Sequence, residues 1–404
     1  MTTRALITEI RDALDAAEAL RDASTQDAPC KIAGAGSKKE LGRHAPAAHT
    51  LSTRALTGVT LYEPEELVLS ARAGTPLREI ERLLDSHRQQ LAFEPMDYGL
   101  IYGASQHAAT IGGTIAVNAS GPRRIKAGAA RDHLLGFHAV TGRGDIVKSG
   151  GRVMKNVTGF DLSKLVCGSY GTLALLTDVT LKVLPKPETE QSLLILGLDE
   201  ARSLDLLRRA TGTPFEVSGY AMVPGGMMPG VDINAAALRL EGPKISVSAR
   251  RGALLTALVD SATRVMNLQA GHSLNFWASI RDAEPVARQS GQIWRLSVAP
   301  TEGHAVVEAI RRASVPLRAH FYDWAGGLIW LAVAPAPDAY ASLVRAAVDA
   351  VGGHATLIRA DAAVRAHVEV FHPQPPALAA LSNRVKDAFD PAHVLERGRM
   401  RAEF

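Results

Sequence analysis

Three glycine-rich segments hold the residues of this chain that are best suited to binding chemistry: IAGAGSKK (32–39), AATIGGTIAVNASG (108–121) and KNVTGFDLSKLVCGSYGTLALLTDVTLKVLP (155–185). Glycine has no Cβ, so its N–H can approach a phosphate closely, and it readily adopts positive φ. Successive N–H groups in such turns form a concave anion site. The three segments together predict one long, doubly phosphorylated ligand. A plain turn after a strand remains the alternative for the first segment alone.

The two common nucleotide-binding motifs do not account for these glycines. A dinucleotide fingerprint requires G-x-G-x-x-G, but after Gly34 and Gly36 the third position holds Lys39. Residues 42–57, where an acidic residue should follow, contain neither Asp nor Glu. No G-x-x-x-x-G-K-[ST] string occurs anywhere. The glycines therefore belong to another nucleotide-binding design.

The composition is that of a large globular protein. The chain has 404 residues, of which 47% are hydrophobic and 21% charged, with a formal net charge of +4. This length supports two domains, and so small a net charge does not indicate a nucleic-acid-binding protein. The basic clusters 123–128 and 397–401 are either local anion contacts or solvated surface.

The cysteines and the hydropathy pattern bound the compartment. Cys30 and Cys167 are the two cysteines, so a disulfide framework is absent and a reducing compartment is expected. Without C-x-x-C the chain cannot hold an iron–sulfur cluster of the usual kind. The N-terminal segment is polar, and no uninterrupted apolar run approaches 18 residues. We expect a cytoplasmic protein, with peripheral attachment to the inner membrane through partners left open.

Periodicity predicts two differently organised halves. The first half should contain an amphipathic helix over 3–22, then strands and turns around the glycine-rich segments. The prolines of PKPETE (185–190) indicate a boundary. The second half alternates expected strands (192–198, 244–250, 293–300, 327–335) with expected helices (198–210, 251–267, 302–313, 337–353 and 376–390). This order predicts an α+β fold with antiparallel strands.

Motifs in both halves resemble one family of flavoproteins. They are GAGS (34–37), LTGVTLYEPEELVLSARAGTPLREIE (56–81), ATIGGTIAVNASGPRR (109–124), GRVMKNVTGFDLSKLVCGSYGTLALLTDVTLKVLPKP (151–187), YDWAGGLIW (322–330) and VKDAFDPAHVLERGRM (385–400). The chain is similar to FAD-binding proteins of the vanillyl-alcohol-oxidase and p-cresol-methylhydroxylase type. Within them it most resembles the E-type, FAD-binding subunits of bacterial glycolate oxidases.

This resemblance implies a fold and a function. The fold would be α+β: a two-subdomain FAD-binding domain over 1–187 and a smaller α/β cap over 188–404 with a mainly antiparallel sheet. The tail 385–404 would return to the first domain. The function would be that of the FAD-binding subunit of a heteromeric glycolate oxidase, acting on glycolate and D-lactate-like 2-hydroxy acids. Its partners would be a catalytic flavoprotein subunit and an iron–sulfur subunit.

The resemblance also implies which residues bind FAD. The first loop would hold the pyrophosphate, the second segment would follow the ribityl chain and the isoalloxazine, and the third would line the other side. The residues are Gly34, Ala35, Gly36, Ser37, Thr110, Ile111, Gly112, Gly113, Ala116, Asn118, Ser120, Gly121, Gly168, Gly171, Leu176 and Thr177.

Three departures from the family pattern matter. GAGSKK contains no histidine, so FAD should be bound non-covalently. The H-x-G-D-G-N motif of the catalytic paralogue is replaced by YDWAGG at 322–327. The Asn-Pro-Gly found near the C-terminus of relatives is changed to ERG at 396–398. The second change places in doubt whether this subunit oxidises glycolate by itself.

Oxidation of a 2-hydroxy acid needs a cation for the carboxylate, a base and the flavin. The candidate catalytic residues are Arg123, Lys126 and Asp323, with Arg124, Lys155, His107 and His372 as further cations and bases. Each has an ordinary structural or surface role as its alternative. The 13 histidines are scattered and none is paired with a carboxylate at ligand spacing, so no metal site is expected.

Three functions remain open on the sequence alone. The chain could be a glycolate oxidase subunit, a self-sufficient FAD-dependent oxidoreductase for another small substrate, or a redox-silent scaffold stabilised by its flavin. Substrate-dependent bleaching of the flavin in the isolated chain distinguishes the second from the others.

Overall fold

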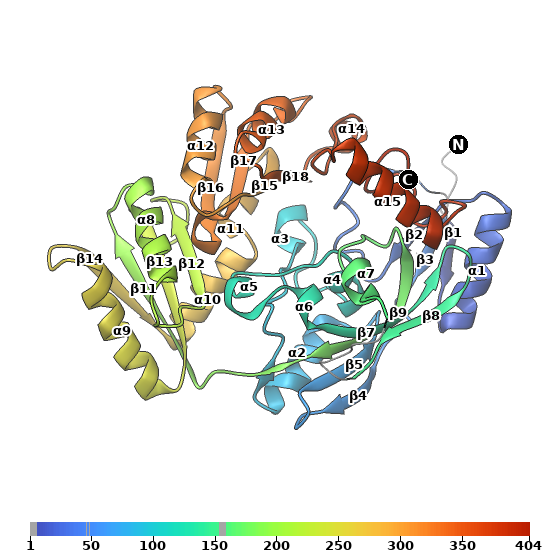
Figure 1. Ribbon diagram of the computed structural model, residues 1–404, viewed down its shortest axis with the longest axis horizontal. Coiled ribbons are helices and arrows are strands. Elements are labelled where there is room, and N and C mark those ends of the chain that lie inside the picture. The colour runs from blue at the N-terminus through green and yellow to red at the C-terminus, as the bar shows by residue number, and fades with distance from the viewer. Residues whose placement is uncertain (1–5, 46, 48, 153–158) are drawn as a thin grey trace.

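A small parallel sheet stands at the N-terminal end of the computed structural model, which describes residues 6–45, 47, 49–152 and 159–404 (Figure 1). Its strand order is β1-β3-β2, and helix α1 shares an apolar core with β2 and β3. The bounds are β1 (Leu6–Glu9), α1 (Ala13–Thr25), β2 (Cys30–Ala33) and β3 (His49–Ser52). The expected helix over 3–22 is wrong at its start, because residues 6–9 pair with β3. Asp12 then begins the helix by accepting hydrogen bonds from the N–H groups of Leu14 (2.8 Å) and Asp15 (2.9 Å).

A five-stranded antiparallel sheet completes the first module, and its order is β4-β5-β9-β7-β8. The strands are β4 (Val59–Glu63), β5 (Val68–Arg72), β7 (Leu134–Thr141), β8 (Ile146–Gly150) and β9 (Ala174–Lys182). The helices are α2 (Leu77–Ser86), α3 (Gly99–Tyr102), α4 (Ile111–Ala116), α5 (Arg124–Ala127), α6 (Ala130–His133) and α7 (Leu162–Val166). Strands β6 (Gln89–Gln90) and β10 (Leu184–Pro185) form a short ribbon. One apolar core joins β5, β7 and β9 to α2 and α4.

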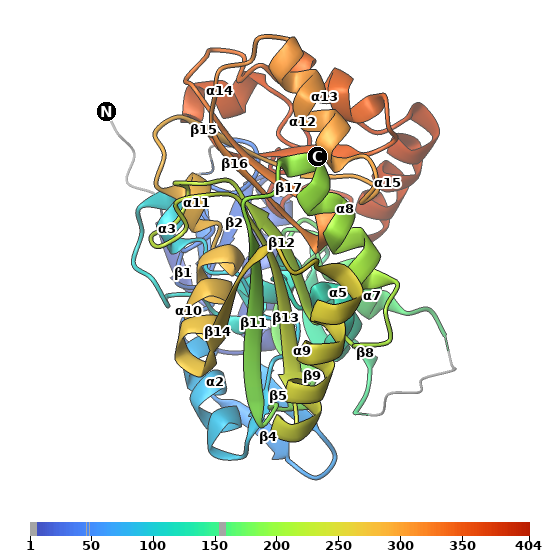
Figure 2. The same cartoon turned by 90° about the vertical axis from the view of Figure 1, so that its left-hand side faces the viewer.

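The second module is built on an eight-stranded antiparallel sheet of order β14-β11-β13-β12-β16-β17-β15-β18 (Figures 1 and 2). Its strands are β11 (Thr189–Leu196), β12 (Gly219–Val223), β13 (Ala235–Gly242), β14 (Arg264–Gln269), β15 (Gln292–Ser297), β16 (Leu317–Asp323), β17 (Leu328–Val333) and β18 (His354–Arg359). Its helices are α8 (Glu200–Thr211), α9 (Lys244–Leu258), α10 (Ala270–Arg281), α11 (Glu284–Ala287), α12 (Gly303–Arg312), α13 (Ala341–Asp349) and the 3₁₀ turn η1 (Trp324–Gly326).

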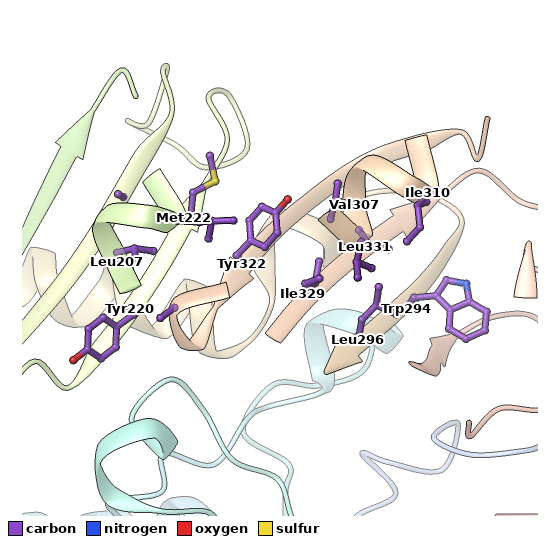
Figure 3. Packing of buried hydrophobic residues seen from close by; sticks show 14 of the residues in the cluster. Leu207, Tyr220, Met222, Trp294, Leu296, Val307, Ile310, Tyr322, Ile329 and Leu331 are labelled. Atoms are coloured by element: carbon purple, nitrogen blue, oxygen red, sulfur yellow. The ribbon is translucent and has the colours of Figure 1, made fainter. Parts of the chain in front are cut away.

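Both faces of the eight-stranded sheet are buried, because successive residues of a strand point to opposite faces. On one face, Trp294, Leu296 and Tyr322 pack with α8, α9, α12 and α13 (Figure 3). On the other face, Phe321 and Trp330 pack with α10, α11 and residues of the first module. The sheet therefore presents its second face to the glycine-rich segments.

Two expected elements of the second module are wrong. Residues 244–250 form the start of helix α9 rather than a strand. Their alternating pattern is misleading: Val247 and Leu254, seven positions apart, face the core, whereas Ile245 is 87% exposed. The expected helix over 251–267 ends at Leu258, and residues 264–269 instead form β14, which pairs with β11.

The C-terminal segment packs against the first module after helices α14 (Ala362–His367) and α15 (Pro376–Phe389) (Figure 1). Lys386, fully buried on α15, donates hydrogen bonds to the Thr172 carbonyl (2.8 Å), the Leu395 carbonyl (3.0 Å) and Asp390 Oδ2 (2.6 Å). Asp390 also accepts hydrogen bonds from the N–H groups of Val394 and Leu395. The Lys386–Asp390 pair thus fixes the last turn of the chain.

We expect Asp390→Ala to lower the free energy of unfolding by about 3 kcal/mol, because removing one partner leaves a buried ammonium uncompensated. Urea unfolding measures this change. The control is Asp387→Ala, because this carboxylate is 58% exposed and pairs with His393. A control loss as large as that of Asp390→Ala would contradict the assignment.

Candidate functional site

The three glycine-rich segments line one cavity of about 370 Å³ in the first module. It lies beside β2, α4 and the C-terminal segment (Figure 1). The residues expected from the sequence that line it are Gly34, Ala35, Gly36, Ser37, Thr110, Gly112, Gly113, Ala116, Gly171 and Leu176. The structure thus brings residues from all three segments together at one place.

The other expected residues do not line this cavity, and they are Ile111, Asn118, Ser120, Gly121, Gly168 and Thr177. Several have structural contacts of their own. Ile111 is part of the apolar core of the first module. Asn118 accepts a hydrogen bond from the Arg131 N–H at 3.1 Å, and Ser120 accepts one from the Ala130 N–H at 2.9 Å. These polar side chains hold the turn that follows α4.

The first loop depends on glycine at two positions for different reasons. Gly36 adopts φ +79°, in the left-handed region that favours glycine. A Cβ on Gly34 would lie 2.6 Å from the Thr110 hydroxyl oxygen, so this position brings the first loop against the second. Thr110 in turn begins α4 by accepting a hydrogen bond from the Gly113 N–H at 3.3 Å.

Gly112 and Gly113 have different roles. Gly112 allows close packing of α4, whereas Gly113 leaves space beside the cavity. A Cβ on Gly112 would lie 2.6 Å from the Cβ of Ala73, so glycine is required for α4 to pack against Ala73, the residue that follows β5. A Cβ on Gly113 would meet only the Thr110 hydroxyl at 3.2 Å and Lys38 Nζ at 4.0 Å. The backbone of Gly113 is therefore the part open to a ligand.

Lys38 is a cavity residue that the sequence did not single out. Lys38 is 6% exposed. Its Nζ donates one hydrogen bond among the described residues, to Ser37 Oγ at 3.4 Å. Burial lowers the pKa of Lys38 to about 8, although Asp97 opposes the effect, and Arg399 adds to it. An ammonium without a carboxylate partner at the wall of a cavity complements an anion.

Three arginines that line the cavity have carboxylate partners, and two of them, Arg365 and Arg399, come from the C-terminal part of the chain. Arg43 contacts Glu369 at 3.3 Å, Arg365 pairs with Glu40, and Arg399 pairs with Glu396 at 2.9 Å. Glu396, in the changed ERG motif, also accepts a hydrogen bond from the Ile32 N–H at 2.8 Å. Apart from the Arg399–Glu396 pair, these contacts join residues more than 300 positions apart, so local sequence carries no signal for them.

The candidate catalytic residues lie away from this cavity. Arg123 forms two hydrogen bonds to Glu241, of 3.0 and 2.7 Å, within a buried group of carboxylates. Lys126 is exposed and pairs with Glu216 at 3.1 Å. Asp323 is buried, accepts a hydrogen bond from the Trp324 N–H at 2.7 Å, and has its pKa raised to about 7 by that burial. None of the three lines the cavity.

Two further candidate catalytic residues that the structure describes, His107 and His372, also do not line the cavity. The side chain of His107 is 68% exposed, and its Nδ1 is 3.9 Å from Asp97. His372 accepts a hydrogen bond from the Ala355 N–H and contacts Asp349. Lys155 lies outside the described residues.

Within the described part of the chain, no three His, Cys, Asp or Glu side chains gather as metal ligands, and no helix has the length and apolar character to cross a bilayer.

Comparison with known proteins defines the class. The FAD binding domain family matches residues 5–150. The fold is that of alkyldihydroxyacetonephosphate synthase, with a TM-score of 0.69 at 16% identity over 96% of this chain and 75% of that one. The protein is a FAD-binding oxidoreductase of the expected α+β class with antiparallel sheets, and FAD is its cofactor.

Over nearly its whole length the chain is 35% identical to Glycolate oxidase subunit GlcE of Escherichia coli K12, with 390 residues aligned and 96% of each chain covered. It therefore belongs to the glycolate oxidase GlcE family, which confirms the resemblance found in the sequence. It is also 44% identical over 101 residues to Glycolate oxidase subunit GlcD of Bacillus subtilis 168, which covers 24% of this chain and 22% of that one. D-lactate dehydrogenase of Anaerostipes hadrus is 37% identical over 134 residues, 33% of this chain and 26% of its own.

We expect Lys38→Met to weaken FAD binding roughly 10- to 100-fold, because a charge-assisted contact is lost. The affinity of the unaltered protein should fall as pH rises through about 8, the pKa of free Lys38, and this dependence should vanish in the variant. Fluorescence titration of the apoprotein with FAD from pH 6 to 9.5 measures both effects. Lys148→Met is the control, because Lys148 is exposed on β8 and does not line the cavity. Unchanged affinity in Lys38→Met would remove Lys38 from the site.

Proposed function

We propose that this chain is the FAD-binding subunit of a heteromeric glycolate oxidase, working with a catalytic flavoprotein subunit and an iron–sulfur subunit. The observation that carries the proposal is the single cavity in which backbone from three glycine-rich segments meets the buried ammonium of Lys38. The near full-length similarity to a protein named as a glycolate oxidase subunit supports the same function.

The residues of the cavity suit FAD. Gly36 and Gly113 present backbone where a side chain would otherwise stand, and Lys38 supplies a cation for a diphosphate. Gly171 and Leu176, from the third segment, also line the cavity. When bound, FAD would supply the hydride-accepting chemistry of 2-hydroxy-acid oxidation. The chain itself holds this group, orients it and excludes water from the buried part of the site.

The segment that replaces the H-x-G-D-G-N motif is occupied by structural contacts. The Tyr322 hydroxyl donates a hydrogen bond to Glu200 at 2.9 Å, on the sheet face turned away from the first module. Asp323 is buried, and its carboxylate accepts a hydrogen bond from the Trp324 N–H. Because neither side chain lines the cavity, we propose that oxidation of glycolate depends on the partner flavoprotein.

We expect the flavin to be bound non-covalently. GAGSKK contains no histidine, and the side chains nearest to Gly113 are those of Thr110 and Lys38. Acid precipitation of the yellow protein should therefore release FAD into the supernatant, measured by its absorbance. Flavin that stays with the precipitated chain would contradict this expectation.

The isolated, FAD-loaded chain should be a poor glycolate oxidase, because a missing general base costs roughly 10²- to 10⁴-fold in rate. Anaerobic mixing with glycolate or D-lactate should leave the flavin absorbance almost unchanged over seconds, and addition of the partner subunits should restore turnover. Fast bleaching of the chain alone would assign the chemistry to this subunit. An active complex assembled from partners without this chain would contradict its role as a subunit.

A further inference from the structure

Trp324 carries two guanidinium groups against its ring at the boundary between the two modules. The Cζ atom of Arg124, on α5 of the first module, is 4.7 Å from the ring centroid. The Cζ atom of Arg295, on β15 of the second module, is 5.3 Å from the same ring and 6.0 Å from the ring of Trp330. Two like charges from different modules therefore lie within about 10 Å of each other.

Neither guanidinium has a carboxylate partner within 4.0 Å in the part of the chain that the structure describes. The remaining residues, 1–5, 46, 48 and 153–158, include no Asp or Glu. Neighbouring arginines behave differently: Arg123 and Arg239 both bind carboxylates of the buried group. A cation pair without a counterion is costly at a partly buried position.

The electrostatic surroundings of the pair are positive. Burial, followed by the charge of Arg295, lowers the pKa of Arg124. Burial, followed by Arg295, His372 and Arg124, lowers the pKa of His354. Arg131, on α6, lies near enough to Arg124 to act in the same direction. The surplus of positive charge is therefore shared by groups from both modules.

The two nearby carboxyl groups are engaged elsewhere. Asp132 accepts a hydrogen bond from the Ala129 N–H at 2.9 Å, and Asp323 accepts one from the Trp324 N–H at 2.7 Å. Burial raises the pKa of Asp323 to about 7, so part of this group is neutral near pH 7. These carboxyls moderate the field without neutralising the pair.

The cation pair is linked to the second glycine-rich segment, although neither the two arginines nor Trp324 line the cofactor cavity. Arg124 follows the second glycine-rich segment, and the Trp324 indole N–H donates a hydrogen bond to the Gly121 carbonyl at 3.4 Å. Burial, followed by Tyr98, raises the pKa of Tyr170. The positive charges of Arg295 and Arg399 oppose this rise without cancelling it. Tyr170 lines the cavity. An anion held by the pair would therefore lie at the boundary between the modules, near the turn that follows α4.

We propose that Arg124 and Arg295, with Trp324, form a binding site for the carboxylate of a small 2-hydroxy or 2-oxo acid. The substrate class rests on the proposed glycolate oxidase function. Guanidinium groups present planar donor pairs that match a carboxylate, and an indole ring offers a surface for the short carbon chain of such an acid. Binding would also neutralise the repulsion between the modules. The site would hold the acid at the boundary between the modules and adds no base.

Isothermal titration of the FAD-loaded chain with glycolate, glyoxylate, chloride and phosphate tests the proposal. We expect one site per chain for each organic acid, with Arg124→Met and Arg295→Met each weakening binding at least 10-fold. Arg295→Lys, which keeps the charge, should recover part of the affinity. The control is Arg202→Met, because the Arg202 side chain is 78% exposed beside Asp199 on α8. This control should bind like the unaltered protein.

Thermal unfolding supplies a second readout that a purely structural role would not produce. The unaltered chain should gain stability with glycolate. Arg295→Met should unfold at an equal or higher temperature without the acid, since repulsion is removed, and should lose the glycolate-dependent gain. A lower unfolding temperature together with unchanged glycolate affinity would overturn the proposal.

Three further results would overturn the site. They are absence of glycolate and glyoxylate binding to a chain that has normal flavin content, equal binding in both methionine variants, and binding of chloride or phosphate as tight as that of the acids. Failure of the proposed function is recognised separately, by absence of flavin binding or by full activity of the partners alone. Acid binding to the FAD-free chain would still be measurable in that case.

Discussion

A buried group of charges between the two modules is the constraint on which the rest of the structure depends. Arg239 on β13 is fully buried and binds Glu94 of the first module through hydrogen bonds of 2.8 and 3.0 Å. Arg123 extends the group to Glu241 and lies 3.7 Å from Glu190. Burial opposes ionisation of Glu94, but Arg123 and Arg239 outweigh it and hold its pKa at about 2. Because separating the modules would leave these charges unpaired, their relative placement is fixed. That placement brings Arg124 to Trp324 and the second sheet face to the turn after α4.

The cofactor cavity depends on a second long-range arrangement, in which the end of the chain returns to its beginning. The Cys30 N–H donates a hydrogen bond to the Val394 carbonyl, and the Glu396 N–H donates one to the Cys30 carbonyl. Arg399 then reaches the Lys38 carbonyl at 3.0 Å. The C-terminal segment therefore closes one side of the loop that carries Lys38, and this enclosure gives an otherwise ordinary lysine its lowered pKa.

Local sequence predicted the glycine-rich loops and most strands, since positive φ at Gly36 and the apolar run of residues 193–196 are properties of short segments. Prediction from local sequence failed where long-range packing determines the secondary structure or the surroundings of a side chain. Residues 244–250 alternate like a strand yet form a helix, because Val247 and Leu254 share one buried face. The burial of Lys38 and the approach of Arg295 to Trp324 depend on residues far apart in the chain, so no local pattern indicates them. For the same reason Arg123 looked like a free cation, although Glu241 and Glu94 surround it.

The central claim is that three glycine-rich segments and Lys38 hold the diphosphate of FAD in one cavity. Crystallographic analysis of the FAD-loaded chain tests it most directly. The account predicts density for the diphosphate against the backbone of Gly36 and Gly113, with Lys38 Nζ within hydrogen-bonding distance of a phosphate oxygen. A diphosphate bound outside this cavity, or a Lys38 side chain turned away from it, would contradict the account.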